Sequence, residues 1–307
     1  MYNHSVIISE TRGDTVQNQN NSIMAVFEAV SEAGELSRAR ISDITGFSLV
    51  TVGKVVDLLC ECGIVTEYKQ TSGTVGRKSG ICKLINSSGM LIFDLTGEPK
   101  ARLYDISLSL CDEYTGDSVC DMMARGLMRF GELLGGELMG IGCIVPDGET
   151  ELCASQISDA IGVSPEIITV SSRAYAVANA KRFHYNGMAV FLRLLDGIDG
   201  AIMYGGRLYT GAHGGAGDIS AFIPSRDVLY PKLTELCYML DPGMIHISCK
   251  SDDECKAVET ELTSHLQGSL GERTPLIVTE PSALCRSASD GAALMLREKY
   301  LLSKTSR

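Results

Sequence analysis

The chain has 307 residues, of which 45% are hydrophobic and 21% charged, and its formal net charge is −11. This composition predicts a soluble globular protein of two or three domains. No run approaches the roughly 20 apolar residues of a membrane span. The polar start MYNHSVIISETRGD has no signal-peptide core, so we expect a cytoplasmic protein without membrane contact.

The distribution of charged residues and cysteines limits which ligands and cross-links we expect. A net charge of −11 disfavours general affinity for nucleic acid, but residues 1–90 hold 8 Lys and Arg against 9 Asp and Glu. A local basic face in this part can therefore still meet DNA. Of eleven cysteines, only Cys60 and Cys62 lie close together, and no C-x-x-C occurs. Free thiols are expected, not a zinc ribbon or a disulfide framework.

Three helices are expected near the N-terminus, after an arm formed by residues 1–20. Apolar residues at helical spacing predict a helix over 21–33. A second, short helix over 38–45 would turn Ile41 and Ile44 inward. The domain that these helices open is assigned to residues 21–88.

The third helix, over 49–62, follows a tight turn at Gly46. Ser37 and Ser48 stand where N-caps of the second and third helices are needed. Helix, short turn with glycine, and helix form a helix-turn-helix pattern whose last helix would enter the major groove of DNA. Its inward stripe is expected to be Val52, Val55, Val56 and Leu59, and its outward face Ser48, Thr51, Lys54 and Asp57.

Two short strands, 64–68 and 80–85, are expected to enclose a polar basic loop. This arrangement is typical of the wing of a winged helix, and its basic side chains would touch phosphates or a minor groove. The alternative is a small helical domain for protein contacts. The residues expected to contact DNA are Ser37, Arg38, Ser48, Thr51, Lys54, Lys69, Arg77 and Lys78.

From residue 89 to the end, strands and helices alternate, which predicts an α/β domain with helices flanking the sheets. The expected strands are 91–94, 101–105, 139–145, 167–170, 188–194, 201–204, 244–248 and 276–279. The expected helices are 120–134, 157–161, 171–183, 229–240, 253–266 and 287–300.

A glycine-rich stretch, 194–223, is typical of tight turns beside a phosphate or sugar, and equally of a hairpin with no ligand. It contains GGRLYTGAHGGAGDI, and other motifs surround it: the helix-turn-helix, FDLTGEPKARLYD, MGIGCIVPDG, LDPGMIHI and ASDGAALML. In this order they resemble the ROK family (repressor, open reading frame, kinase), in its winged-helix repressor branch, from about Asn18 to the C-terminus.

The resemblance implies a winged helix-turn-helix followed by a shortened actin/hexokinase-like (ribonuclease H-like) two-lobed domain. The lobes would comprise residues 89–183 with the C-terminal helix, and residues 184–285. Family kinases phosphorylate sugars with ATP in this domain, and repressor members sense a sugar there. Family members are usually dimers or tetramers, and we expect a dimer here.

The motif positions that carry kinase chemistry are altered. Where the family has its catalytic aspartate, this chain has Arg173, and a guanidinium cannot deprotonate a hydroxyl. Ser172 replaces the sugar-binding asparagine. The first phosphate cradle follows Asp94 and has an acid, Glu98, at or next to its threonine position.

The second cradle carries Asp196 and Asp199 where small residues belong, and these acids would repel a triphosphate. The sugar-and-zinc run survives only as 218–221, without its histidine or the cysteines that follow in the family, so no structural zinc is expected. The segment between Pro146 and Val170 is also short.

These observations together predict a DNA-binding transcriptional regulator whose kinase-like domain is catalytically inactive. The family branch that the chain resembles implies a repressor. Its partner would be a double-stranded operator, with a sugar-like or anionic effector as a second partner; no cofactor or metal is expected. A sugar kinase and a protein-interaction scaffold are the alternatives. Asp94, Arg173 and Asp218 are the candidate ligand-binding residues, although Arg173 and Arg193 also suit structural ion pairs with acids such as Asp218.

Overall fold

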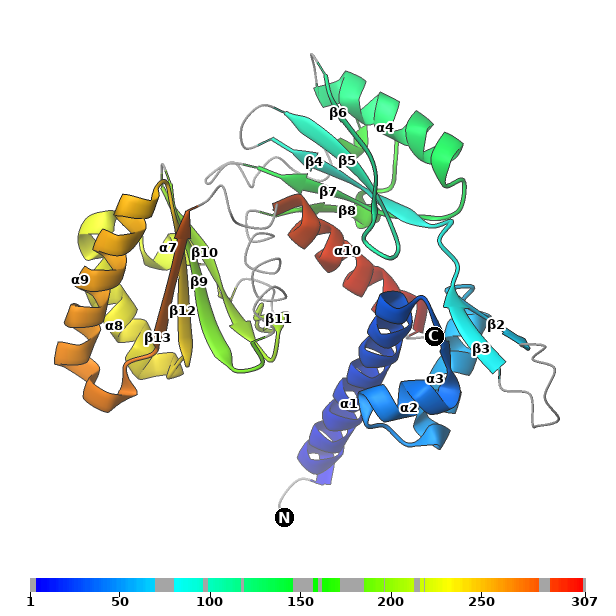
Figure 1. Ribbon diagram of the computed structural model, residues 1–307, viewed down its shortest axis with the longest axis horizontal. Coiled ribbons are helices and arrows are strands. Elements are labelled where there is room, and N and C mark those ends of the chain that lie inside the picture. The colour runs from blue at the N-terminus through cyan, green and yellow to red at the C-terminus, as the bar shows by residue number, and fades with distance from the viewer. Residues whose placement is uncertain are drawn as a thin grey trace.

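The computed structural model describes residues 4–69, 80–95, 99–116, 119–145, 157–159, 162–171, 185–195, 197–212, 216–217, 219–281 and 288–305. Three parts follow one another along the chain: a small domain of helices and short strands, and two lobes that are each built on a five-stranded sheet (Figure 1). The α/β fold with an N-terminal winged helix and two lobes is therefore confirmed.

The N-terminal domain packs three helices against a three-stranded antiparallel sheet of order β1-β3-β2. The expected helices and wing strands are present, and the sheet gains a short strand, β1, that the sequence did not suggest. The elements are α1 (His4–Ala33), β1 (Glu35–Ser37), α2 (Arg38–Thr45), α3 (Leu49–Glu61), β2 (Val65–Lys69) and β3 (Gly80–Leu84).

Two local expectations in this domain differ from the structure. α1 begins at His4, so residues 4–20, which were assigned to an arm, belong to the same helix. Ile41 is buried as expected, but the inward orientation of Ile44 is wrong, because this side chain is 52% exposed. Ile44 lies in the last turn of α2, beside the Gly46 turn, where the short helix leaves the core.

The first lobe has a sheet of order β6-β5-β4-β7-β8, in which β4, β5 and β6 are antiparallel and β4, β7 and β8 parallel. Strand β6 was missed because it is an exposed edge strand with only one buried side chain. The elements are β4 (Gly89–Asp94), β5 (Lys100–Asp105), β6 (Leu110–Thr115), α4 (Val119–Leu133), β7 (Leu138–Ile144), η1 (Pro165–Ile167) and β8 (Ile168–Val170). Residues 157–159 are helical, and the helix expected over 171–183 lies outside the described residues.

The second lobe repeats this connectivity, with a sheet of order β11-β10-β9-β12-β13. Helices α8 and α9 pack on one face of it and form a core with β9, β10 and β12. The elements are β9 (Met188–Leu194), β10 (Ile198–Tyr204), β11 (Arg207–Leu208), α7 (Ile219–Phe222), η2 (Arg226–Val228), α8 (Leu229–Leu240), β12 (Met244–Cys249), α9 (Asp252–Leu270), η3 (Gly271–Arg273) and β13 (Leu276–Pro281).

The last helix, α10 (Ala288–Thr305), connects the three parts. It lies across the first sheet, against β4 and β7, and its end reaches α1 (Figure 1). Gly140 on β7 permits this approach, since a Cβ there would lie 2.9 Å from Leu296 Cδ2. Leu294 on the same helix joins the core on the inner face of the second sheet. The winged helix, the first lobe and α10 thus share one continuous hydrophobic core.

Candidate nucleic-acid interface and altered cradles

The helix-turn-helix is stabilised by the two predicted serine caps. The backbone N–H of Arg40 donates to Ser37 Oγ at 3.3 Å, and the N–H of Thr51 donates to Ser48 Oγ at 3.1 Å. Each bond satisfies an N–H group that a helix start leaves without a backbone partner. Between the two helices, Gly46 adopts φ 72°, a conformation that favours glycine. These local features fix the angle at which α3 leaves the turn.

The predicted inward stripe of α3 is confirmed, because Val52, Val55, Val56 and Leu59 are all buried. On the outward side, Ser48, Lys54 and Asp57 are exposed and Thr51 is half-buried. The hydroxyls of Ser48 and Thr51 lie 3.0 Å apart, so both take part in the cap. Lys54 is the cation of α3, and no ion pair involves it among the residues that the structure describes.

Arg38 has a different environment from the one expected of a DNA contact. Its guanidinium lies 2.6 Å from Asp57 Oδ1 on α3 and 2.8 Å from Glu67 Oε2 on β2. A hydrogen bond to Glu67 first, and one to Asp57 second, raise the pKa of Arg38. This side chain joins α2, α3 and the wing, and it balances the charge of Asp57.

The wing is described only at its base. Lys69 is exposed at the end of β2, whereas Arg77 and Lys78 lie outside the described residues. On β1, Glu35 accepts a hydrogen bond from Tyr68 at 2.7 Å and from Lys83 at 3.1 Å. These cross-strand contacts hold the three strands in register. Lys69 and Lys83 are both exposed basic residues of the wing strands, and Lys83 is paired with Glu35.

The first cradle position lies at the end of β4. The Asp94 carboxylate is 3.9 Å from the guanidinium of Arg102 on β5, opposite the start of α10. Arg102 also bonds Glu113 at 2.5 Å and Ser289 at 2.6 Å. Asp94 therefore belongs to a charged group that joins β4, β5, β6 and α10, while residues 96–98 of the cradle lie outside the described chain.

The second cradle differs from the expectation of two uncompensated acids. Asp199 does not lie in the turn but within β10, directly opposite Arg193 on β9. Arg193 Nη2 and Asp199 Oδ2 are 2.9 Å apart, and Asp199 is 1% exposed. The partner of Arg193 is thus its cross-strand neighbour, and Asp199 is charge-balanced; Asp196 and Asp218 lie outside the described residues.

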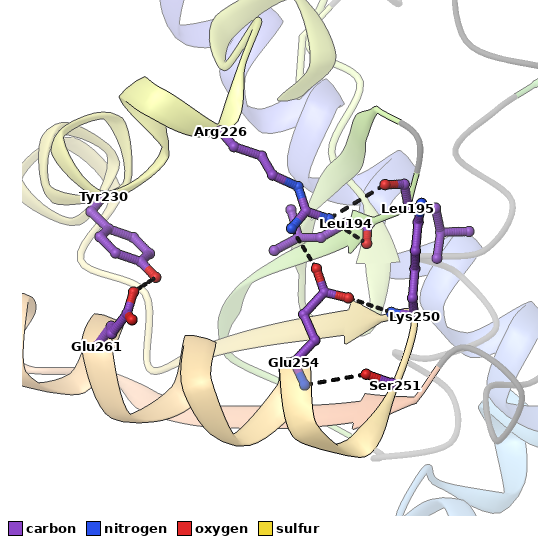
Figure 2. A network of polar contacts seen from close by, with 8 residues as sticks. All are labelled: Leu194, Leu195, Arg226, Tyr230, Lys250, Ser251, Glu254 and Glu261. Atoms are coloured by element: carbon purple, nitrogen blue, oxygen red, sulfur yellow. Dashed lines mark hydrogen bonds and ion pairs between the residues drawn. The ribbon is translucent and has the colours of Figure 1, made fainter.

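A network around Arg226 contacts the backbone at the end of β9. Figure 2 shows the guanidinium donating to the carbonyl oxygens of Leu194, at 2.8 Å, and Leu195, at 3.3 Å. It also bonds Glu254 in the first turn of α9, whose carboxylate accepts the Lys250 N–H at 2.8 Å. The cradle-like turn is therefore tied to α9, a contact that the sequence did not suggest.

Replacing Arg226 by Gln is expected to weaken the acid sensitivity of the second lobe. Burial raises the pKa of Glu254, but Arg226 and the Lys250 N–H outweigh burial and hold it below its ordinary value of 4.5. The stabilisation is therefore complete above the unfolded pKa and is lost as pH falls through the folded pKa. Because both side chains are partly exposed, we expect under about 1 kcal/mol, measured as thermal stability from pH 3 to 7.

The control for this prediction is Arg273→Gln, which removes an exposed ion pair with Asp241 in the same lobe. The Arg273→Gln variant should show the same pH dependence of thermal stability as the wild type. An Arg226→Gln profile that keeps the full acid-induced loss would contradict the assignment.

Several predicted positions cannot be placed. Ser172 and Arg173 lie outside the described residues. Within the described ranges, no group of three His, Cys, Asp or Glu side chains has the arrangement of a metal site. In the same ranges, no helix has the length and hydropathy to cross a membrane.

Sequence reasoning also missed two side chains at the start of α3. Leu49 and Val50 are 59% and 70% exposed, although both are large and apolar. The signal was present in the helical spacing, since Val50 precedes Lys54 by four residues and so shares its face. The fold and these positions define a winged helix-turn-helix joined to a two-lobed α/β domain, in which Asp94 and Asp199 are each paired with an arginine.

Solved structures with this fold can be named. A ROK family transcriptional regulator, described as a homolog of the E. coli MLC protein, matches with a TM-score of 0.63 at 15% identity, covering 94% of this chain and 98% of its own. A ROK family protein from Streptococcus pneumoniae in complex with sucrose has a TM-score of 0.47 at 16% identity, covering 71% and 100%. A ROK hexokinase from Thermus thermophilus has a TM-score of 0.48 at 16% identity, covering 67% of this chain and 97% of its own.

No protein-family model and no curated protein sequence matches the chain. The similarity to the ROK family transcriptional regulator, at 15% identity, is a similarity of fold, and it extends over nearly the whole of both chains. The chain therefore has the fold of a ROK family transcriptional regulator, as its motifs predicted.

Proposed function

We propose that the chain is a ROK family transcriptional regulator that binds an operator in double-stranded DNA through α3. The observation that carries the proposal is the capped helix-turn-helix, at whose leading end Ser48 and Lys54 are exposed and Thr51 is half-buried. In helix-turn-helix proteins the N-terminal residues of this helix contact base edges in the major groove. The fold shared with a ROK family transcriptional regulator supports the same role.

The proposal includes a dimer in the cytoplasm. Two copies would present two recognition helices to half-sites one helical turn apart, so the operator would be a palindrome. The acidic two-lobed part would supply the contacts between copies and hold a small effector, sugar-like or anionic. Lys69 at the wing, with Arg77 and Lys78 in the adjoining loop, would contact phosphates.

We also propose that the two-lobed part transfers no phosphate. A family kinase needs a base that takes a proton from the sugar hydroxyl, and Arg173 stands where the resemblance puts that base. Guanidinium keeps its proton at neutral pH. Asp94 and Asp199, each beside an arginine, have the environment of structural ion pairs.

Lys54→Ala is expected to weaken operator binding about tenfold, the loss typical of one base or phosphate contact. The duplex is selected from a random library with the wild-type protein, and binding is measured by fluorescence anisotropy at one fixed salt concentration.

Lys256→Ala is the matched control, because Lys256 is an exposed lysine on α9, in the second lobe. It should bind as the wild type does. Equal affinities for both variants and the wild type would contradict the role of α3, and ADP release with a hexose or an N-acetyl amino sugar would contradict the absence of phosphate transfer.

A further inference from the structure

The outer face of α3 is more apolar than a phosphate-binding helix needs. Its buried stripe turns Val50 and Lys54, four residues apart, to the opposite side of the helix. Val50 is 70% exposed, and Leu49 beside it is 59% exposed. Two aliphatic side chains thus lie at the start of the helix that would enter the major groove. Their exposure to water is unfavourable unless a partner covers them.

The sequence of α3 limits how it can recognise bases. Guanine is usually read by a bidentate Arg or Lys, and adenine by Asn or Gln. Helix α3, LVTVGKVVDLLCE, contains no Arg, Asn or Gln, and Lys54 lies in its second turn. Besides the hydroxyls of Ser48 and Thr51, which can bond either kind of base, its first turn offers an apolar contact with the C5-methyl group of thymine, which only A·T pairs present in the major groove.

Charge restricts this contact to the first half of the helix. Farther along α3, Asp57 is paired with Arg38, and Glu61 is exposed in the last turn. An exposed carboxylate repels phosphate, so the second half of α3 faces away from the backbone of the duplex. The first turn, with its N–H groups and aliphatic side chains, is the part suited to the floor of the groove.

We propose that Leu49 and Val50 read thymine methyl groups, so that each operator half-site carries thymine opposite the first turn of α3. The inference rests on the proposed DNA binding and adds the base that is recognised. A groove of about 620 Å³ between α1 and α3 includes Val50, Phe47 and Leu58 in its lining. A protein partner seated in that groove is the competing occupant, and the experiment separates the two.

The experiment uses the full chain and the duplex selected from a random library. Each thymine is replaced in turn by uracil, which removes the methyl group and leaves the base-pairing edge unchanged. Uracil at one or two positions in each half-site should weaken binding about fourfold per methyl, the effect of losing one buried methyl-sized group. Val50→Ala should weaken binding to the thymine duplex and add little on the uracil duplex, since the two changes remove the same contact.

Ile44→Ala is the control, because Ile44 is an exposed aliphatic residue of α2, 52% accessible. It should keep the wild-type response to uracil. Failure of the wild type to select or bind any duplex would overturn the proposed function together with this inference. Tight binding that tolerates uracil at every position would overturn the inference alone, as would a Val50→Ala variant that binds normally but changes its oligomeric state.

Discussion

Arg193→Met is expected to lower the free energy of unfolding of the second lobe by about 3–5 kcal/mol, the cost of leaving a buried charge without its partner. Asp199 is 1% exposed in β10, and the Arg193 guanidinium lies 2.9 Å from it on the neighbouring strand. Methionine preserves most of the side-chain volume, so the loss would come from charge and not from a cavity.

The matched control for this prediction is Arg193→Met combined with Asp199→Leu, which removes both charges. Replacement of a whole buried ion pair by apolar side chains is often neutral, so most of the stability should return. The chain contains no tryptophan whose fluorescence could report unfolding, and a single unfolding curve would combine several domains. Hydrogen exchange of peptides from β9 and β10 is therefore the suitable measurement, because it reports the stability of these strands alone. Unchanged protection in the single variant would show that Asp199 does not depend on Arg193.

Phe27→Ala is expected to cost about 3–5 kcal/mol, as large core truncations do, and to loosen the winged helix from the rest of the molecule. Phe27 is fully buried on α1, and its ring centroid lies 5.0 Å from the guanidinium carbon of Arg297 on α10. Burial lowers the pKa of Arg297, whose Nη2 is 3.9 Å from Glu28 Oε1. Removing the ring would take away both packing and a cation–π contact.

Phe130→Ala is the control, because Phe130 is buried in the separate core beneath α4. It should destabilise the first lobe while α1 keeps its protection against hydrogen exchange. Phe27→Leu should retain most of the stability but not the cation–π contact. If Phe27→Ala left the exchange of α1 and α10 unchanged, the shared core would not be what attaches the winged-helix domain to the rest of the molecule.

Features that depend on neighbouring residues were predictable. The caps at Ser37 and Ser48, the bounds of α2 and α8, and the buried stripe of α3 all follow from side-chain type and helical spacing. Each is decided within about one or two helical turns, where backbone hydrogen bonds and side-chain periodicity act. The alternation of strands and helices likewise indicated the repeated α/β lobes.

Features that depend on distant partners were not predictable. Arg38 suits a phosphate contact in the sequence, but its acids, Asp57 and Glu67, lie 19 and 29 residues away. Edge strand β6 has too few buried positions to show an apolar pattern, and β1 exists because β3 pairs with it. The clamp of Arg226 on the β9–β10 turn also joins segments that are far apart in the chain.

By itself, the sequence determined the order of the elements, the caps of the helix-turn-helix and the presence of charged side chains at the positions where the resemblance implies kinase residues. Only the tertiary structure decided that Asp199 is balanced by Arg193, that Arg38 is paired with Asp57 and Glu67, and that Val50 is exposed on α3. The physical reason is the same for all three. Charge balance and burial depend on which surfaces meet after folding, and spacing along the chain does not specify them.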